Sequence, residues 1–126
     1  MHIDHIAIWT TDLEKEKDFF LKYFNCTAGK MYSNPRKHFS SCFISFADGS
    51  RIELMKRNDI GTRYEGESLG YAHIAIKAGS REKVEKLTER LEKDGFTIKS
   101  KPRQTGDGYY ESVILDPENN IIEITC

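Results

Sequence analysis

The sequence has no apolar run that approaches the roughly 20 residues a membrane-spanning helix needs. Its amino terminus, MHIDHIAIW, also lacks the pattern of a secretory signal peptide. Hydrophobic residues make up 38% and charged residues 31% of the 126 residues, which is typical of a chain that folds without a membrane. We therefore expect one domain of cytoplasmic protein.

Paired cysteines and an excess of one charge are also missing. The three cysteines, Cys26, Cys42 and Cys126, lie far apart and form no Cys-x-x-Cys pair, which favours free thiols over disulfides or a thiolate zinc site. Lys and Arg number 19 against 20 Asp and Glu, so no broad basic face is predicted. We expect a small-molecule substrate as partner, and neither nucleic acid nor membrane.

The chain instead repeats itself. Residues 3–9 (IDHIAIW) match residues 71–77 (YAHIAIK), and SFADGSRIEL at 45–54 matches ILDPENNIIEI at 114–124. His5 and Glu53 are 48 residues apart, and His73 and Glu123 are 50 apart. Such a repeat predicts two copies of one supersecondary unit. We place module one at 1–57, a polar linker at 58–70 and module two at 71–126.

Each module should fold as β-α-β-β-β, which makes an α+β protein with eight strands. The first helix is predicted to begin at Thr11, with Glu14 completing a capping box, and to end near Asn25. The second is predicted to begin at Ser80 and to stop at Gly95. The remaining strands are expected at Thr27–Tyr32, His38–Phe46, Thr97–Ser100 and Tyr109–Leu115.

Strand alternation singles out four residues. In both HIAI segments the isoleucines share one face, which should pack against the helices, so the histidines take the other face. Glu53 and Glu123 interrupt apolar strands and should point to that same side. A lone strand histidine is more often structural than a ligand, and a charge buried alone is costly, but a divalent metal explains both pairs at once. Two imidazoles and two carboxylates suit Ni²⁺, Co²⁺, Zn²⁺, Mn²⁺ or Fe²⁺.

These segments resemble the vicinal oxygen chelate superfamily, which contains glyoxalase I-like, bleomycin-resistance and dioxygenase proteins. The resemblance covers the whole chain and is most specific in LDPENNIIEI. It implies two tandem βαβββ modules that form an eight-stranded half-open barrel around one metal, in a glyoxalase-like fold. It implies His5, Glu53, His73 and Glu123 as ligands, and a homodimer, since small members commonly pair.

The resemblance also implies a metal-dependent lyase or isomerase of the lactoylglutathione lyase type. Proton transfer through a metal-bound enediolate needs a Lewis acid and a base, and similarity assigns the base to Glu123 with Glu53 assisting. Glyoxalase I enzymes usually carry arginine and asparagine where this chain has Trp9 and Arg57. We therefore expect a small vicinal-oxygen compound or another thiol hemithioacetal as substrate, with Trp9, Arg57 and Tyr110 as candidate substrate-binding residues.

Three other functions stay open. An extradiol dioxygenase resembles this fold but uses two histidines and one glutamate on Fe²⁺, and a fosfomycin-inactivating thiol transferase also uses three ligands. Glu53, as a fourth candidate ligand, argues against both. A metal-free drug-sequestering protein of the bleomycin-resistance kind would have no need to retain four ligands.

Overall fold

The computed structural model describes residues 1–63, 66 and 69–126. Four residues of the predicted linker 58–70, at positions 64, 65, 67 and 68, lie outside the described residues. The chain divides into two compact units, Met1–Tyr64 and Glu65–Cys126. Each unit is described by itself, and the module boundaries at 57 and 71 stay a prediction.

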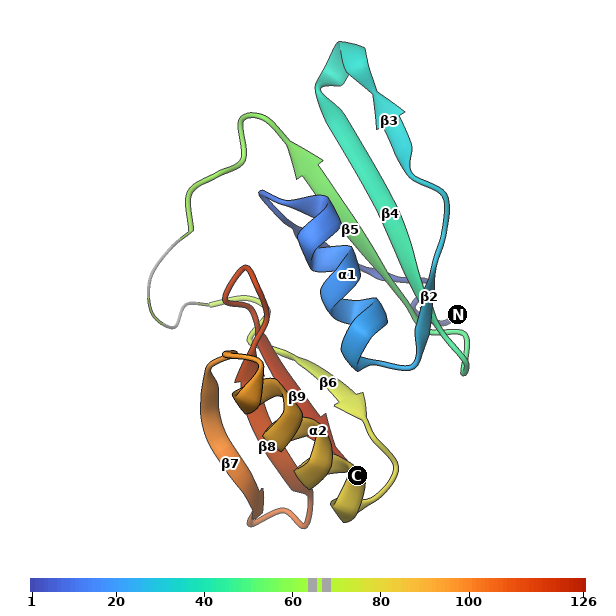
Figure 1. Ribbon diagram of the computed structural model, residues 1–126. Coiled ribbons are helices and arrows are strands. Elements are labelled where there is room, and N and C mark those ends of the chain that lie inside the picture. Colours follow the sequence, from blue (N-terminus) through green and yellow to red (C-terminus); the bar gives the residue numbers. More distant parts are fainter. Residues whose placement is uncertain (64–65, 67–68) are drawn as a thin grey trace. The chain divides into compact units, whose positions relative to one another are not determined.

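The first unit is one mixed sheet with a helix on one face (Figure 1). The sheet has the order β1-β5-β4-β2, and β3 also pairs with β4. β1 runs parallel to β5, and the other pairings are antiparallel. The elements are β1 (Ile6–Trp9), α1 (Leu13–Tyr23), β2 (Cys26–Ala28), β3 (Tyr32–Asn34), the 3₁₀ turn η1 (Pro35–Lys37), β4 (Phe39–Phe46) and β5 (Arg51–Arg57).

The second unit repeats this topology. Its sheet has the order β6-β9-β8-β7, again with a parallel first pair and antiparallel partners. Helix α2 covers one face of the sheet (Figure 1). The elements are β6 (Ile74–Lys77), α2 (Arg81–Lys93), β7 (Ile98–Gln104), β8 (Tyr110–Leu115) and β9 (Ile121–Thr125). The α+β class and the internal repeat are therefore confirmed.

The predicted number of strands is wrong by one, because the described residues form sheets of five and four strands. The strand expected at Thr27–Tyr32 is split into β2 and β3. Ala28 pairs with Ile44 and Tyr32 with Ser41, so three residues on one side oppose two on β4. This extra residue is a β-bulge, which breaks the ladder locally. The matching strand of the second unit, β7, also carries register shifts.

The helix caps confirm one predicted start and correct the other. The Ser80 side chain accepts a hydrogen bond from the backbone N–H of Lys83 and caps α2 as predicted. Asp12, and not Thr11, caps α1 by accepting from the N–H of Lys15. Both residues are good N-caps, and only the carboxylate of Asp12 reaches the third helical N–H.

Each sheet buries one face against its helix. Leu54, on β5, and Ile124, on β9, have no exposed area. They alternate with Glu53 and Glu123, which therefore lie on the opposite face of their sheets. The parallel pairs align Ala7 with Glu53 and Ala75 with Glu123, so the predicted repeat register is confirmed. The buried apolar residues are Leu13, Phe19, Phe20, Tyr23, Phe24, Cys42, Ile44, Ile52, Leu54, Val84, Leu91, Ile114, Ile122 and Ile124.

Tight turns fix where the two glutamate strands begin. Gly49 adopts φ +90° before β5, and Asn119 adopts φ 64° before β9. The Asp116 carboxylate accepts hydrogen bonds from the backbone N–H groups of Glu118 and Asn120, at 2.9 and 2.7 Å. These bonds explain the Asp-Pro-x-Asn sequence, since an aspartate that binds the turn backbone holds β8 and β9 in register.

The chain has three cysteines, Cys26, Cys42 and Cys126. All three are free thiols, and Cys42 is buried. Burial raises the pKa of the Cys26 and Cys42 thiols, which favours their neutral form. Among the helices that the structure describes, none is long and apolar enough to cross a membrane.

Candidate metal centre

In the first unit, His5 and Glu53 form a facing pair of donor atoms. His5 lies one residue before β1 rather than within it, because the strand begins at Ile6. Its Nε2 lies 3.6 Å from Oε2 of Glu53, whose side chain is 18% exposed. The edge of the His5 ring also packs against Phe43, with 5.2 Å between ring centroids. The glutamate carboxylate is thus held beside an imidazole nitrogen on the face away from α1.

In the second unit, His73 and Glu123 form the equivalent pair. Nε2 of His73 lies 3.2 Å from Oε2 of Glu123, whose side chain is 20% exposed. His73 also precedes its strand by one residue. Within each unit the structure thus brings together one histidine and one glutamate of the four residues that the sequence singled out, while their role as metal ligands stays a prediction.

The distances within each pair fit two ligands of one metal ion. Ligands about 2.1 Å from a metal lie about 3.0 Å apart at an octahedral angle and about 3.4 Å apart at a tetrahedral angle. The observed separations, 3.6 Å for His5–Glu53 and 3.2 Å for His73–Glu123, are close to these values. Within residues 1–63, 66 and 69–126, no three His, Cys, Asp or Glu side chains gather into a metal-binding group. Each unit by itself therefore holds one pair of potential donor atoms.

A second carboxylate orients His5. Nδ1 of His5 donates a hydrogen bond to Oδ2 of Asp4 at 2.8 Å, which leaves the lone pair of Nε2 for a metal. Asp4 also pairs with Arg51, whose guanidinium lies 4.7 Å above the Phe43 ring. The bond from His5 and the charge of Arg51 hold the pKa of Asp4 below its usual value. Ala72 precedes His73, so the second unit lacks this support.

Trp9 and Arg57 lie together in the first unit, whereas Tyr110 lies in the second unit. The Arg57 guanidinium lies 5.1 Å above the Trp9 ring, and both residues line a cavity of the first unit. Tyr110 lies on the face that carries α2, where its hydroxyl donates to Glu85 at 2.7 Å and its ring lies under Arg81. Its position does not favour contact with a substrate beside Glu123, and its role stays a prediction.

Sequence reasoning missed Asp4, Phe43, Lys37 and Phe39 around these groups. Asp4 stands directly before His5, so the Asp-His dipeptide was a usable signal for an oriented imidazole. Lys37 and Phe39 gave no such signal. Phe39 reaches Arg57 only because β4 and β5 pair these two positions.

Comparisons with known proteins identify the family of the chain. The model of the Glyoxalase/Bleomycin resistance protein/Dioxygenase superfamily matches residues 2–124. The chain belongs to this superfamily. The resemblance predicted from the sequence is thereby confirmed.

Several superfamily members show how far the likeness extends. The uncharacterized protein YqjT of Bacillus subtilis strain 168 is 24% identical over 97% of this chain and 96% of its own. A glyoxylase/bleomycin resistance protein/dioxygenase domain from Frankia sp. EAN1pec has a TM-score of 0.84 at 17% identity, over 99% of this chain and 96% of that one. Glyoxalase I from Zea mays has a TM-score of 0.80 at 20% identity, over 97% of this chain. This chain spans only 43% of that enzyme. At these identities the solved structures show a shared fold.

Proposed function

We propose that this protein is a metal-dependent lyase or isomerase of the glyoxalase type. One divalent metal (Ni²⁺, Co²⁺, Zn²⁺, Mn²⁺ or Fe²⁺) would be held by His5, Glu53, His73 and Glu123, inside a half-open barrel of the two modules. The observation that carries the proposal is the matched register: each unit sets a His–Glu pair beside the same parallel strand pair. A single structural histidine would not require this repetition.

The donor set suits proton transfer between adjacent carbons. A divalent ion bound there would supply a Lewis acid for the negative charge that develops on two vicinal oxygens of a substrate. Glu123 would take the proton from one carbon and return it to the next, and Glu53 would assist from the other unit. His5 and His73 would hold the donor geometry, with Asp4 fixing the ring of His5.

The substrate would be a small vicinal-oxygen compound or a thiol hemithioacetal. Trp9 and Arg57 take the two positions where glyoxalase I enzymes usually grip glutathione, so glutathione itself is not expected to be the preferred thiol. Tyr110 would at most contribute from the edge of the site. A cytoplasmic homodimer completes the proposal, and sedimentation at high micromolar concentration tests the dimer.

The test is a pair of matched substitutions, Glu123→Gln and Glu53→Gln. Glutamine keeps the shape and a coordinating oxygen but loses the basicity of the carboxylate. On any substrate found by screening, Glu123→Gln should lower kcat by roughly 10²–10⁴, the usual contribution of a general base. Glu53→Gln should lower kcat less. Equal kcat for Glu123→Gln and the parent protein at equal metal content would remove Glu123 as the base.

A further inference from the structure

An aromatic, positively charged cavity lies on the first unit. Trp9, Lys37, Phe39 and Arg57 line this cavity of about 480 Å³, a volume within the range of small-molecule sites. Trp9, Phe39 and Arg57 come from β1, β4 and β5 of one sheet, and Lys37 comes from the turn η1 that precedes β4. We call these four residues the Trp9 pocket.

The Trp9 pocket and the first metal pair share one face of the sheet. Arg57 and Glu53 are four residues apart on β5, so their side chains point to the same side. His5 precedes Ala7, the partner of Glu53, by two residues, and Trp9 follows it by two. Four strand residues span about 13 Å, so one elongated ligand can reach both places.

The pocket offers flat apolar surface to a ligand. The Trp9 and Phe39 rings meet edge to face, with centroids 6.3 Å apart and planes at 89°. Trp9 remains 38% exposed, and Tyr32 extends the aromatic row from Phe39 with 6.2 Å between centroids. Exposed aromatic rings that adjoin one another mark binding surfaces more often than isolated ones do. A planar ring can pack against these side chains.

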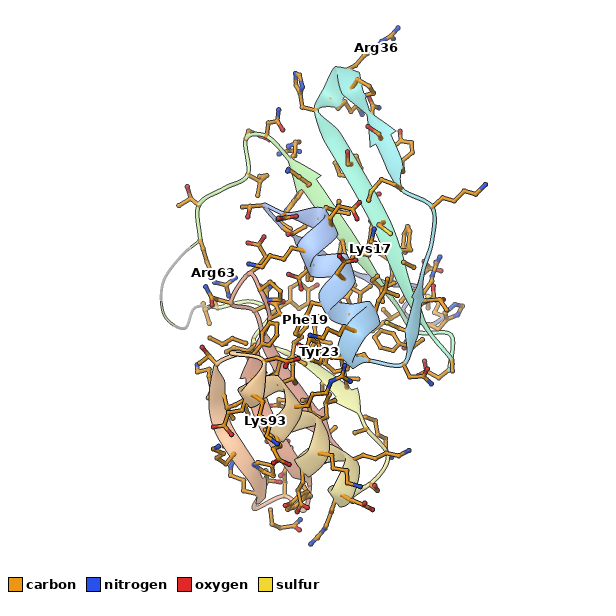
Figure 2. The ribbon with its side chains drawn as sticks, viewed as in Figure 1. Lys17, Phe19, Tyr23, Arg36, Arg63 and Lys93 are labelled. Atoms are coloured by element: carbon orange, nitrogen blue, oxygen red, sulfur yellow. The ribbon has the colours of Figure 1, made fainter. Side chains whose placement is uncertain are left out.

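The pocket also carries an excess of positive charge. Nε of Arg57 donates to Oδ1 of Asp59 at 2.5 Å, and this bond keeps the pKa of Asp59 low. The terminal nitrogens of Arg57 and the ammonium of Lys37 make no hydrogen bond or ion pair elsewhere in the described part of the chain. Two cations against one carboxylate leave one net positive charge. Arg36, beside Lys37, points away from the sheet into solvent (Figure 2).

We infer that the Trp9 pocket binds an oxyanion, a carboxylate or a phosphate, that is attached to a planar ring. Arg57 and Lys37 hold the oxyanion, and the ring packs on Trp9 and Phe39. We take this aryl anion as the end of the substrate that lies away from the metal, and in this respect the inference rests on the proposed function. It defines the substrate as an aryl-bearing anion about 13 Å long from its charged end to its vicinal oxygens.

Trp9 is the only tryptophan of the chain, so its fluorescence reports on this pocket alone. The assay titrates chelator-treated protein at constant ionic strength with phenylacetate and with phenyl phosphate. Acetate, inorganic phosphate and benzyl alcohol supply the charge or the ring alone. At least one aryl anion should give a saturable change in fluorescence with a Kd of about 1 mM or below. This Kd should be at least about tenfold lower than that of the compounds that carry only the charge or only the ring. The better of the two identifies the oxyanion.

Substitutions that remove one positive charge test whether the cations of the pocket, and not those beside it, bind the ligand. Arg57→Gln and Lys37→Gln should each weaken binding about tenfold, the usual loss for a charge-assisted hydrogen bond. The matched controls are Lys56→Gln, whose side chain points to the other face of β5, and Arg36→Gln. Both controls should bind as the parent does. Circular dichroism checks that each variant is folded.

Two results would overturn the inference: no saturable change with either aryl anion, or equal affinity in the pocket variants and the controls. The binding assay needs no metal, so its result is independent of whether the proposed metal-dependent function is correct. Suppose that neither the parent protein nor the His5→Ala/His73→Ala variant contains metal. Saturable binding of an aryl anion would then support the pocket while removing the metal proposal. A metal-loaded parent without saturable binding would do the reverse.

Discussion

Removing the Asp4 carboxylate should weaken metal binding without unfolding the protein. In the structure its Oδ2 accepts from Nδ1 of His5 at 2.8 Å and so aims Nε2 at Glu53. Losing such a partner of a metal ligand typically lowers metal affinity 10- to 100-fold. The Asp4 side chain is 63% exposed, and solvent screens its charge, so the lower end applies. Asp4→Ala should therefore raise the metal Kd about tenfold.

The assay is competition for Zn²⁺ or Ni²⁺ against a chromophoric chelator. Asp18→Ala is the matched control, because Asp18 is an exposed carboxylate on α1, which covers the other face of the sheet. The control removes the same charge and should leave the metal Kd unchanged. Metal affinity for Asp4→Ala within twofold of the control would show that the Asp4–His5 bond does not support a metal ligand. The account of how His5 is oriented would then be wrong.

Two further predictions concern the core and the substrate. Leu54→Ala should lower the free energy of unfolding by about 2–5 kcal/mol in chemical denaturation, because Leu54 is fully buried beneath α1; a loss below about 1 kcal/mol would contradict the packing of this face. The glutathione hemithioacetal of methylglyoxal should be turned over weakly, since Trp9 and Arg57 replace the usual glutathione grip; a kcat/KM of about 10⁵ M⁻¹s⁻¹ or more would refute this.

The sequence predicted the parts of the fold that depend on local patterns. The repeated HIAI and Ile-Glu segments were enough to place the glutamates on the face opposite the buried isoleucines in both units, because alternation alone decides which side chains share a face. The parallel pairing of these strands came from the structure. The Ser80 cap and the Gly95 stop were readable for the same reason: both depend on a few adjacent residues.

The parts that depend on pairing between distant residues could not be predicted in this way. The break between β2 and β3 follows from one extra residue opposite β4. Gly29 hints at a bulge, since a glycine within a strand often marks one, but the pairing with β4 is needed to locate it. Tyr110 looked like a pocket residue until the register of β8 placed it beside α2. The Trp9 pocket could not be predicted because it depends on the pairing of Phe39 with Arg57, which are 18 positions apart in the sequence.

Metal content of untagged protein tests the central claim most directly. Elemental analysis of the parent should give about one divalent transition metal per chain, and the His5→Ala/His73→Ala variant should give almost none. The matched control is His2→Ala/His38→Asn, which removes the two histidines outside the pairs and keeps a residue that tolerates the φ of 48° at position 38. This control should keep its metal. Full metal retention in His5→Ala/His73→Ala would contradict the account.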